Sequence, residues 1–274
     1  MTTRLSATLA AAAVLLLGAY GCTDITAEPQ STVTGTNIFN DPSAYRAFLA
    51  KLYGGLQVTG QQGPAGTTPD IEGIDEGFSH YIRQLWQLQE LPTDEAVIGW
   101  GDQGLPELNT QLWGPGNQFL AAMYYRIFFQ VVLANEFLRE TTDAKLASRN
   151  ASPALIAQVQ QYRAEARFLR ALSYWHGIDL FGNIPLVTEA DGIGSTPPPQ
   201  ATRQAVFDYV VGELNAIRTT LPAPGAGEYG RADQGAVLML LSKLYMNSAV
   251  YTGTARYAEA RAAVEAVIAS GGYQ

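Results

Sequence analysis

The sequence predicts an all-α fold built from antiparallel helical hairpins. Apolar residues recur at spacings of three and four over most of the chain after residue 40, which is the period of an amphipathic helix. No comparable stretch alternates apolar and polar residues with the period of two that a half-buried strand requires. Short segments with Gly or Pro separate the helical stretches, so neighbouring helices can fold back on one another.

Composition limits the classes of function. A chain of 274 residues with 47% hydrophobic residues can form one large or two small domains, and it is too apolar to be disordered. The net charge of -8 and the lack of a Lys/Arg cluster argue against nucleic acid as a partner, because nothing would neutralise a run of phosphates.

The N-terminus is typical of an exported lipoprotein. Residues 1–21 are predicted to be a signal peptide, since Arg4 precedes an apolar run that is shorter than the roughly 20 residues of a membrane span. Cys22 follows directly and is the only cysteine, so it cannot form an intramolecular disulfide; its setting resembles a bacterial lipobox, in which the cysteine is lipidated. Residues 22–39 then form a predicted flexible tether, although an ordinary disordered tail has the same composition.

Three helices are expected in the first two thirds of the chain. The first begins with Asp41 as its cap and Pro42 at its first position, and it ends at the pair Gly54-Gly55. The second spans Asn117–Arg139, with an apolar stripe from Leu120 to Leu138. The third starts near Pro153. Ahead of the second, the segment "YIRQLWQLQE" also has the helical period.

The third helix stops at a Gly-Asn-Ile-Pro corner. Ala164, Phe168, Ala171, Leu172 and Trp175 share one face, so most of its aromatic content is expected to pack. Gly182 follows the last turn and can adopt the left-handed conformation that closes a helix, and Pro185 then prevents the helix from resuming.

Arg167 and Arg170 lie one turn apart on this largely apolar helix. Arginines that are even partly buried need polar partners. Glu165, Asp179 and the carbonyls at helix ends are the candidate partners, and we interpret the pair as a structural latch. A ligand-binding role is the weaker alternative, because both arginines lie beside core residues rather than in a loop.

Further helices are predicted at Gln204–Thr220, Gln234–Val250 and Arg256–Ala269. The last two face each other across a short Gly-containing turn, with small alanines opposite large residues. This arrangement resembles a tetratricopeptide hairpin, in which small residues let antiparallel helices approach closely.

The segment "EARFLRALSYWHGIDLFGNIPLV" resembles the signature of the RagB/SusD family of nutrient-uptake outer-membrane lipoproteins, and it contains Arg167, Arg170, Gly182 and Pro185. Further segments agree with the family in the same order: "LPTDEAVIGW", "MYYRIFFQVVLANEFL", "YGRADQGAVLMLLSKLYM" and "YAEARAAVEAVIASGGY". The resemblance extends from about Asn40 to the last residue.

The resemblance implies a tetratricopeptide-like, SusD-like helical domain over residues 40–274 that carries a loop-rich ligand-binding region. It also implies a lipid-anchored outer-membrane protein, exposed on the cell surface, that captures glycans or peptides and passes them to a SusC-like TonB-dependent transporter without cleaving them. Members of the family generally continue well beyond the "SGGY" near the end of this chain, so we expect the domain to be incomplete.

The segment between Gln57 and Asn117 is the expected ligand region. It is rich in Gly, Pro, Asp and Asn, and it contains the candidate ligand residues Trp100, Asp102, Asn109 and Trp113. Aromatic side chains stack on apolar sugar faces, while carboxylates and amides bond sugar hydroxyls. A large aromatic in a loop equally often anchors that loop, so both roles stay open, and Trp113 is the one that we expect to pack.

The sequence contains no residue pattern that favours an enzyme. Asp94 and Glu95 are adjacent, a poor geometry for the facing carboxylates of a glycosidase. His80 and His176 are far apart, and neither has a metal-ligating companion at helical spacing, so no catalytic, metal or cofactor site is predicted. A tetratricopeptide-type lipoprotein that scaffolds envelope proteins from the periplasmic side is the alternative function, and an envelope glycoside hydrolase ranks third.

Overall fold

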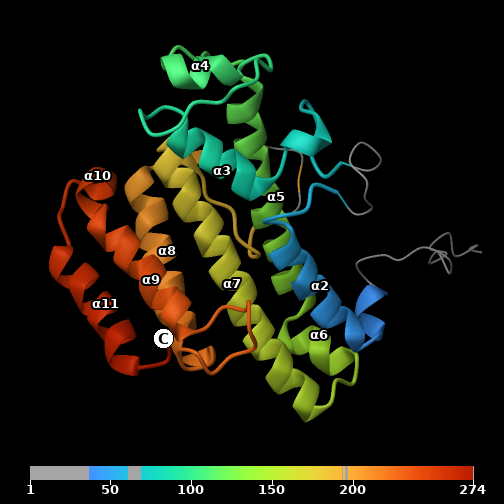
Figure 1. Cartoon of the computed structure of the whole chain (residues 1–274). Helices are drawn as coiled ribbons and strands as arrows, with labels where there is room; N and C mark the ends of the chain where they lie inside the picture. Colours follow the sequence, from blue (N-terminus) through green and yellow to red (C-terminus); the bar gives the residue numbers. More distant parts are fainter. Residues whose placement is uncertain (1–36, 61–68, 193, 195–196, 274) are drawn as a thin grey trace, which may run out of the picture. The chain divides into compact units, whose positions relative to one another are not determined.

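The computed structural model of the chain describes residues 37–60, 69–192, 194 and 197–273 (Figure 1). The described residues from Phe39 onward form one compact unit. The predicted signal peptide at residues 1–21 and the lipidation site Cys22 lie outside the described residues, as does most of the predicted tether at residues 22–39. These three assignments stay predictions.

The structure confirms the all-α prediction. Its α-helices are α2 (Ser43–Gly54), α3 (Tyr81–Glu90), α4 (Leu105–Thr110), α5 (Gln118–Glu140), α6 (Asp143–Ser148), α7 (Pro153–Phe181), α8 (Arg203–Ile217), α9 (Gln234–Met246), α10 (Ser248–Thr252) and α11 (Tyr257–Ser270). Short 3-10 helices are η1 (Ile38–Asn40), η2 (Glu76–Phe78) and η3 (Arg218–Thr220). Among the described residues, no helix has both the length and the apolarity needed to cross a bilayer.

The helices pack side by side around α7. Neighbours in contact are α5 with α7, α7 with α8, α8 with α9, and α9 with α11, while α2 and α3 contact α5 (Figure 1). The predicted face of α7 is confirmed, since Ala164 and Ala171 are buried and the large side chains of Phe168, Leu172 and Trp175 pack against the same core. Ala260 and Ala263 are the buried side chains that α11 presents, as expected for closely spaced helices.

Two predicted helix ends differ from the structure. The helix predicted to run from Gln234 to Val250 is interrupted at Asn247, whose N–H bonds to the carbonyls of Lys243 and Tyr245. Asparagine is a weak helix former, and the chain turns there before α10 begins. The helix predicted to end at Thr220 ends at Ile217, and its last turn tightens into η3.

The corner after α7 also differs in detail. Gly182 has φ 76° and ψ -110°, which is not the left-handed helical conformation that we predicted but another region accessible to glycine. A Cβ at this position would lie 3.0 Å from a guanidinium nitrogen of Arg203. Pro185 then enters the two-residue strand β1 (Ile184–Pro185), which pairs antiparallel with β2 (Gln200–Ala201).

Candidate functional site

Residues 91–117, which we call the aromatic loop, join α3 to α5 and include α4. Large apolar side chains are exposed along it: Trp100 is 55% exposed, Trp113 42%, Val97 82% and Leu112 79%. Exposed large apolar side chains on one loop are candidates for contact with another surface. Both tryptophans that the sequence proposed therefore lie at the surface. The expectation that Trp113 packs is wrong, since this side chain is exposed.

Side-chain amides fix the shape of the aromatic loop. Asn109 on α4 donates from Nδ2 to the carbonyls of Leu91 at 2.8 Å and Ala96 at 3.1 Å, and Gln111 donates to the carbonyl of Pro92 at 2.6 Å. These bonds hold the first part of the loop against α4. Asn109 was proposed as a ligand contact, and the structure gives its amide nitrogen two backbone partners.

A polar cavity of about 330 Å³ opens at the end of this loop. Asn117 is buried there: its Oδ1 accepts from the N–H of Phe119 at 3.0 Å, which caps α5, and its Nδ2 donates to the Gly104 carbonyl at 2.7 Å and to Glu107 Oε2 at 2.9 Å. The lining residues are Gln103, Gly104, Glu107, Gly114, Gly116, Asn117 and Gln118. Amide and carboxylate groups thus surround a space large enough for a sugar unit.

The sequence reasoning missed the role of Asn117, although an Asn directly before an apolar helical run is a recognisable cap signal. Asp102, the remaining candidate, follows Trp100 in the chain and precedes α4. Its side chain is half-buried, and its carbonyl accepts from the N–H of Leu105. Within the described residues, no group of three or more His, Cys, Asp or Glu side chains is arranged to bind a metal ion.

Replacing Asn109 by Ala is expected to loosen the aromatic loop. The carbonyls of Leu91 and Ala96 would lose their amide partner, which costs about 1–2 kcal/mol of unfolding free energy. Hydrogen exchange of residues 92–96 should accelerate, and chemical denaturation should report the loss. Asn215→Ala is the matched control, because the Asn215 amide makes one exposed bond within its own helix. Unchanged exchange in the Asn109 variant would show that the loop does not depend on this side chain.

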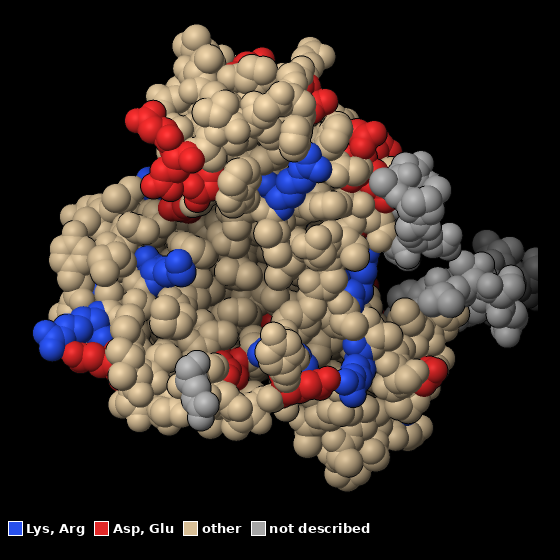
Figure 2. All heavy atoms as spheres, viewed as in Figure 1, with Lys and Arg blue, Asp and Glu red and all other residues tan. Residues whose placement is uncertain are grey.

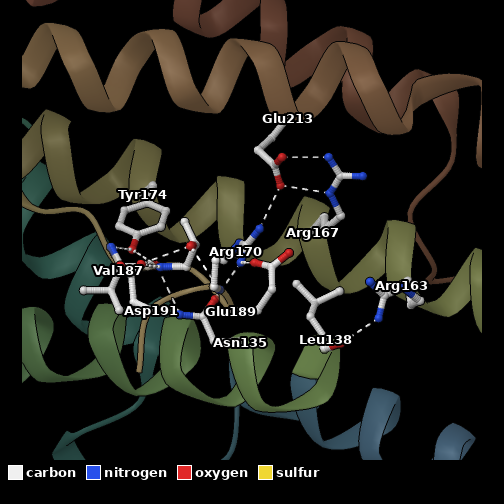
Figure 3. A network of polar contacts seen from close by, with 12 residues as sticks. Asn135, Leu138, Arg163, Arg167, Arg170, Tyr174, Val187, Glu189, Asp191 and Glu213 are labelled. Carbon is white, nitrogen blue, oxygen red and sulfur yellow. Dashed lines mark hydrogen bonds and ion pairs between the residues drawn. The ribbon is translucent and has the colours of Figure 1, made fainter. Parts of the chain in front are cut away.

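A second polar cluster surrounds the signature arginines (Figure 3). Arg167 donates from Nε and Nη2 to the two carboxylate oxygens of Glu213 on α8, at 2.9 Å and 2.6 Å. Arg170 is buried and donates to Asn135 on α5 at 2.6 Å, to Glu213 at 2.8 Å and to Glu189. The cluster therefore joins α5, α7, α8 and the segment after the corner.

The latch interpretation is supported, but the predicted partners of the two arginines are wrong. Glu165 pairs with Arg231, and Asp179 accepts from Gln89 and Tyr251. Both carboxylates lie on α7 itself, whereas the arginines reach charges on neighbouring elements. Burial alone would raise the pKa of Glu213, but hydrogen bonds and charge from Arg167 and Arg170 outweigh it and lower that pKa below the ordinary value.

A third buried arginine, Arg126 on α5, organises the segment before α3. It donates to the carbonyl and hydroxyl of Ser79 at 2.5 Å and 2.8 Å, to the Thr59 carbonyl at 3.1 Å and to Asp70 at 3.3 Å. The sequence reasoning did not identify it. A lone arginine within the apolar run "MYYRIFFQVV" was the available signal.

His176 is buried on α7, and its Nδ1 lies 2.9 Å from the hydroxyl of Tyr81. Burial, with a smaller contribution from the charge of Lys243, lowers the pKa of His176 to about 4. In the unfolded chain, the His176 ring becomes protonated below about pH 6.5, whereas in the folded protein it stays neutral down to about pH 4. The stability that comes from the neutral ring is therefore present above pH 6.5 and is lost as the pH falls toward 4.

We expect the free energy of unfolding to fall by about 2–3 kcal/mol between pH 7 and 4.5 because of the His176 titration. Urea denaturation of wild type and His176→Gln across this range measures it. The carboxylates that pair with arginines weaken both proteins in acid, so the difference between the two slopes isolates the histidine. Equal slopes would contradict the assignment.

Stacked helical hairpins with an irregular loop that exposes aromatic side chains define the class as a tetratricopeptide-like, all-α protein. No protein-family model matches the sequence. The chain is 35% identical over 263 residues, 94% of its length, to the starch-binding protein SusD of Bacteroides thetaiotaomicron, and it spans 44% of that relative.

Solved structures agree with this relationship at the level of the fold. A SusD homologue from Bacteroides thetaiotaomicron superposes with a TM-score of 0.66 at 20% identity, over 88% of this chain and 43% of that one. The surface glycan-binding protein A of Bacteroides fluxus gives a TM-score of 0.61 at 20% identity, over 85% and 45%. The chain belongs to the SusD-like (RagB/SusD) family, and it spans less than half the length of these relatives.

Proposed function

We propose that this protein captures glycans at the cell surface by reversible binding and passes them to a SusC-like TonB-dependent transporter. The exposure of Trp100 and Trp113 on a loop whose backbone is fixed by Asn109 and Gln111 is the observation that carries the proposal. The name of the starch-binding relative supports glycans as the ligand class.

Binding follows from the chemistry of the aromatic loop. The apolar face of a sugar ring stacks on an indole, which removes both surfaces from water. Hydroxyl groups at the ring edge then bond the amides and carboxylates nearby, such as Gln103, Glu107 and Gln118 around the polar cavity. Nothing in this mechanism breaks a glycosidic bond, so the proposal is a binding protein rather than an enzyme.

Trp100→Ala is expected to weaken glycan binding roughly tenfold, because one stacking contact contributes about 1–1.5 kcal/mol. Calorimetry with a panel of uncharged heptasaccharides, including maltoheptaose and laminariheptaose, measures the change. Tyr257→Ala is the control, since Tyr257 is 58% exposed on α11, outside the aromatic loop. Equal affinity of wild type and the Trp100 variant would remove the loop from the proposed site.

The cellular part of the proposal places the body on the outer membrane through lipidated Cys22 and a tether at residues 22–39. Detergent extraction of the full-length gene product, wild type beside Cys22→Ala, tests it by mass analysis of co-purifying proteins. A stoichiometric TonB-dependent barrel, protease access on intact cells and release from the membrane by Cys22→Ala are the expected results. A protein that is protected inside the envelope and lacks a barrel would contradict surface capture.

A further inference from the structure

The aromatic loop carries negative charge without positive charge. Its acidic residues are Asp94, Glu95, Asp102 and Glu107, and no Lys, Arg or His occurs from residue 91 to residue 125. Asp94 and Glu95 are exposed, while Asp102 and Glu107 are half-buried. Several red side chains accordingly lie over the α3–α4 segment on the face drawn in Figure 2.

These four carboxylates form no ion pair with any residue that the structure describes, since the salt bridges involve other acids. The closest cations along the chain are engaged elsewhere. Arg83 on α3 donates to the Gly77 carbonyl and lies over the ring of Phe78, and Arg126 is buried against Ser79 and Thr59. The aromatic loop therefore carries a net negative charge that no ion pair among the described residues neutralises.

We infer that the aromatic loop selects uncharged glycans and rejects polyanionic ones, such as those built from uronic acids. The inference rests on the proposed function and names the charge class of its ligand. The bonds from Asn109 and Gln111 hold residues 91–96, which include Asp94 and Glu95, against α4. A sugar that stacks on Trp113, two residues after Gln111, therefore lies near the carboxylates of this segment. Neutral hydroxyls can bond to these groups, whereas a ligand carboxylate is repelled by them.

The size of the discrimination follows from Coulomb's law. Two unit charges about 8 Å apart in water repel by roughly 0.5 kcal/mol, close to a twofold change in affinity for each pair. An oligosaccharide with several carboxylates opposite several loop carboxylates should therefore bind at least about tenfold more weakly at low ionic strength. Salt shortens the Debye length to about 3 Å at 1 M, so the difference in affinity between neutral and anionic glycans should shrink as salt is added.

The test compares maltoheptaose with the same heptasaccharide after oxidation of its C6 hydroxyls to carboxylates, which keeps the linkage and length. Oligogalacturonate of equal length and the uncharged panel extend the comparison to other backbones. Affinities are measured by calorimetry at low and high salt for wild type and for Asp94→Asn/Glu95→Gln. Asp208→Asn/Glu265→Gln is the matched control, because it changes the net charge equally on α8 and α11.

We expect the oxidised ligand to bind wild type at least about tenfold more weakly than its parent does. The Asp94→Asn/Glu95→Gln variant should bind the oxidised ligand at least about threefold more tightly than wild type does. The control variant should show no such gain. Discrimination that neither salt nor the variant reduces would be steric and would overturn the inference. Equal or tighter binding of the anionic glycans would also overturn it while leaving glycan capture standing. Failure of every glycan to bind would overturn the proposed function and this inference with it.

Discussion

Arg170→Met is expected to destabilise the protein by about 3–5 kcal/mol, since it removes a buried cation, leaves Glu189 without its salt bridge and leaves Glu213 with Arg167 alone. Arg170 is 1% exposed and bonds Asn135, Glu189 and Glu213, which come from three different elements. Methionine fills a similar length but donates nothing. The pKa of Glu189, which Arg170 lowers against the opposing effect of burial, would rise toward or above its ordinary value.

Arg167→Met supplies the control one turn earlier on the same helix. The Arg167 side chain is 28% exposed and binds only Glu213, which would keep its bond from Arg170. Water screens this pair more strongly, so about 1 kcal/mol is expected. Chemical denaturation of both variants at neutral pH measures the difference. Similar small losses would show that the cluster in Figure 3 does not stabilise the fold.

Arg126→Met is expected to cost a comparable 3–5 kcal/mol and to loosen the chain before α3. The buried Ser79 carbonyl would lose its donor, and the Thr59 carbonyl would keep only the N–H of Asp70, at 2.8 Å. The Asp70 carboxylate would keep only Lys51, at 3.2 Å. The hydrogen-exchange rate of residues 76–80 should rise by local opening, without global unfolding, because the Arg126 guanidinium bonds this segment to α5.

Lys51→Met is the matched control, since it removes the other cation from Asp70 at a partly exposed position. We expect a loss of about 1 kcal/mol or less. Exchange at residues 76–80 should stay near the wild-type rate. If Lys51→Met matched Arg126→Met in both measurements, the ion pairs of Asp70 rather than the carbonyl bonds would hold this segment.

Much of the helical scaffold could be predicted because an amphipathic helix is indicated by the spacing of apolar residues within a short stretch of sequence. The stripe in α5 and the face of α7 each repeat within a few residues, and their start signals are adjacent in sequence. The short helices α4 and α6 were not predicted, since six residues are too few to show a period. The break at Asn247 was missed because the apolar period continues across it.

The candidate site was predicted less completely. The sequence placed Trp100 and Trp113 in the irregular segment before α5, where the structure exposes both, but it could not show that the Asn109 amide bonds two carbonyls. The partner of Asn109 at Leu91 lies 18 residues away, and loop backbone has no period from which such a contact follows.

The sequence by itself determined the long helices, the position of the glycine-proline corner after α7 and the family signature, because each depends on residues that are close together in the chain. The tertiary structure alone decided which charges meet. Arg167 and Arg170 both bond Glu213, which lies 46 and 43 residues further along the chain, rather than acidic residues on their own helix. A buried guanidinium needs acceptors in its own plane, and only the packing of α5, α7 and α8 brings them there.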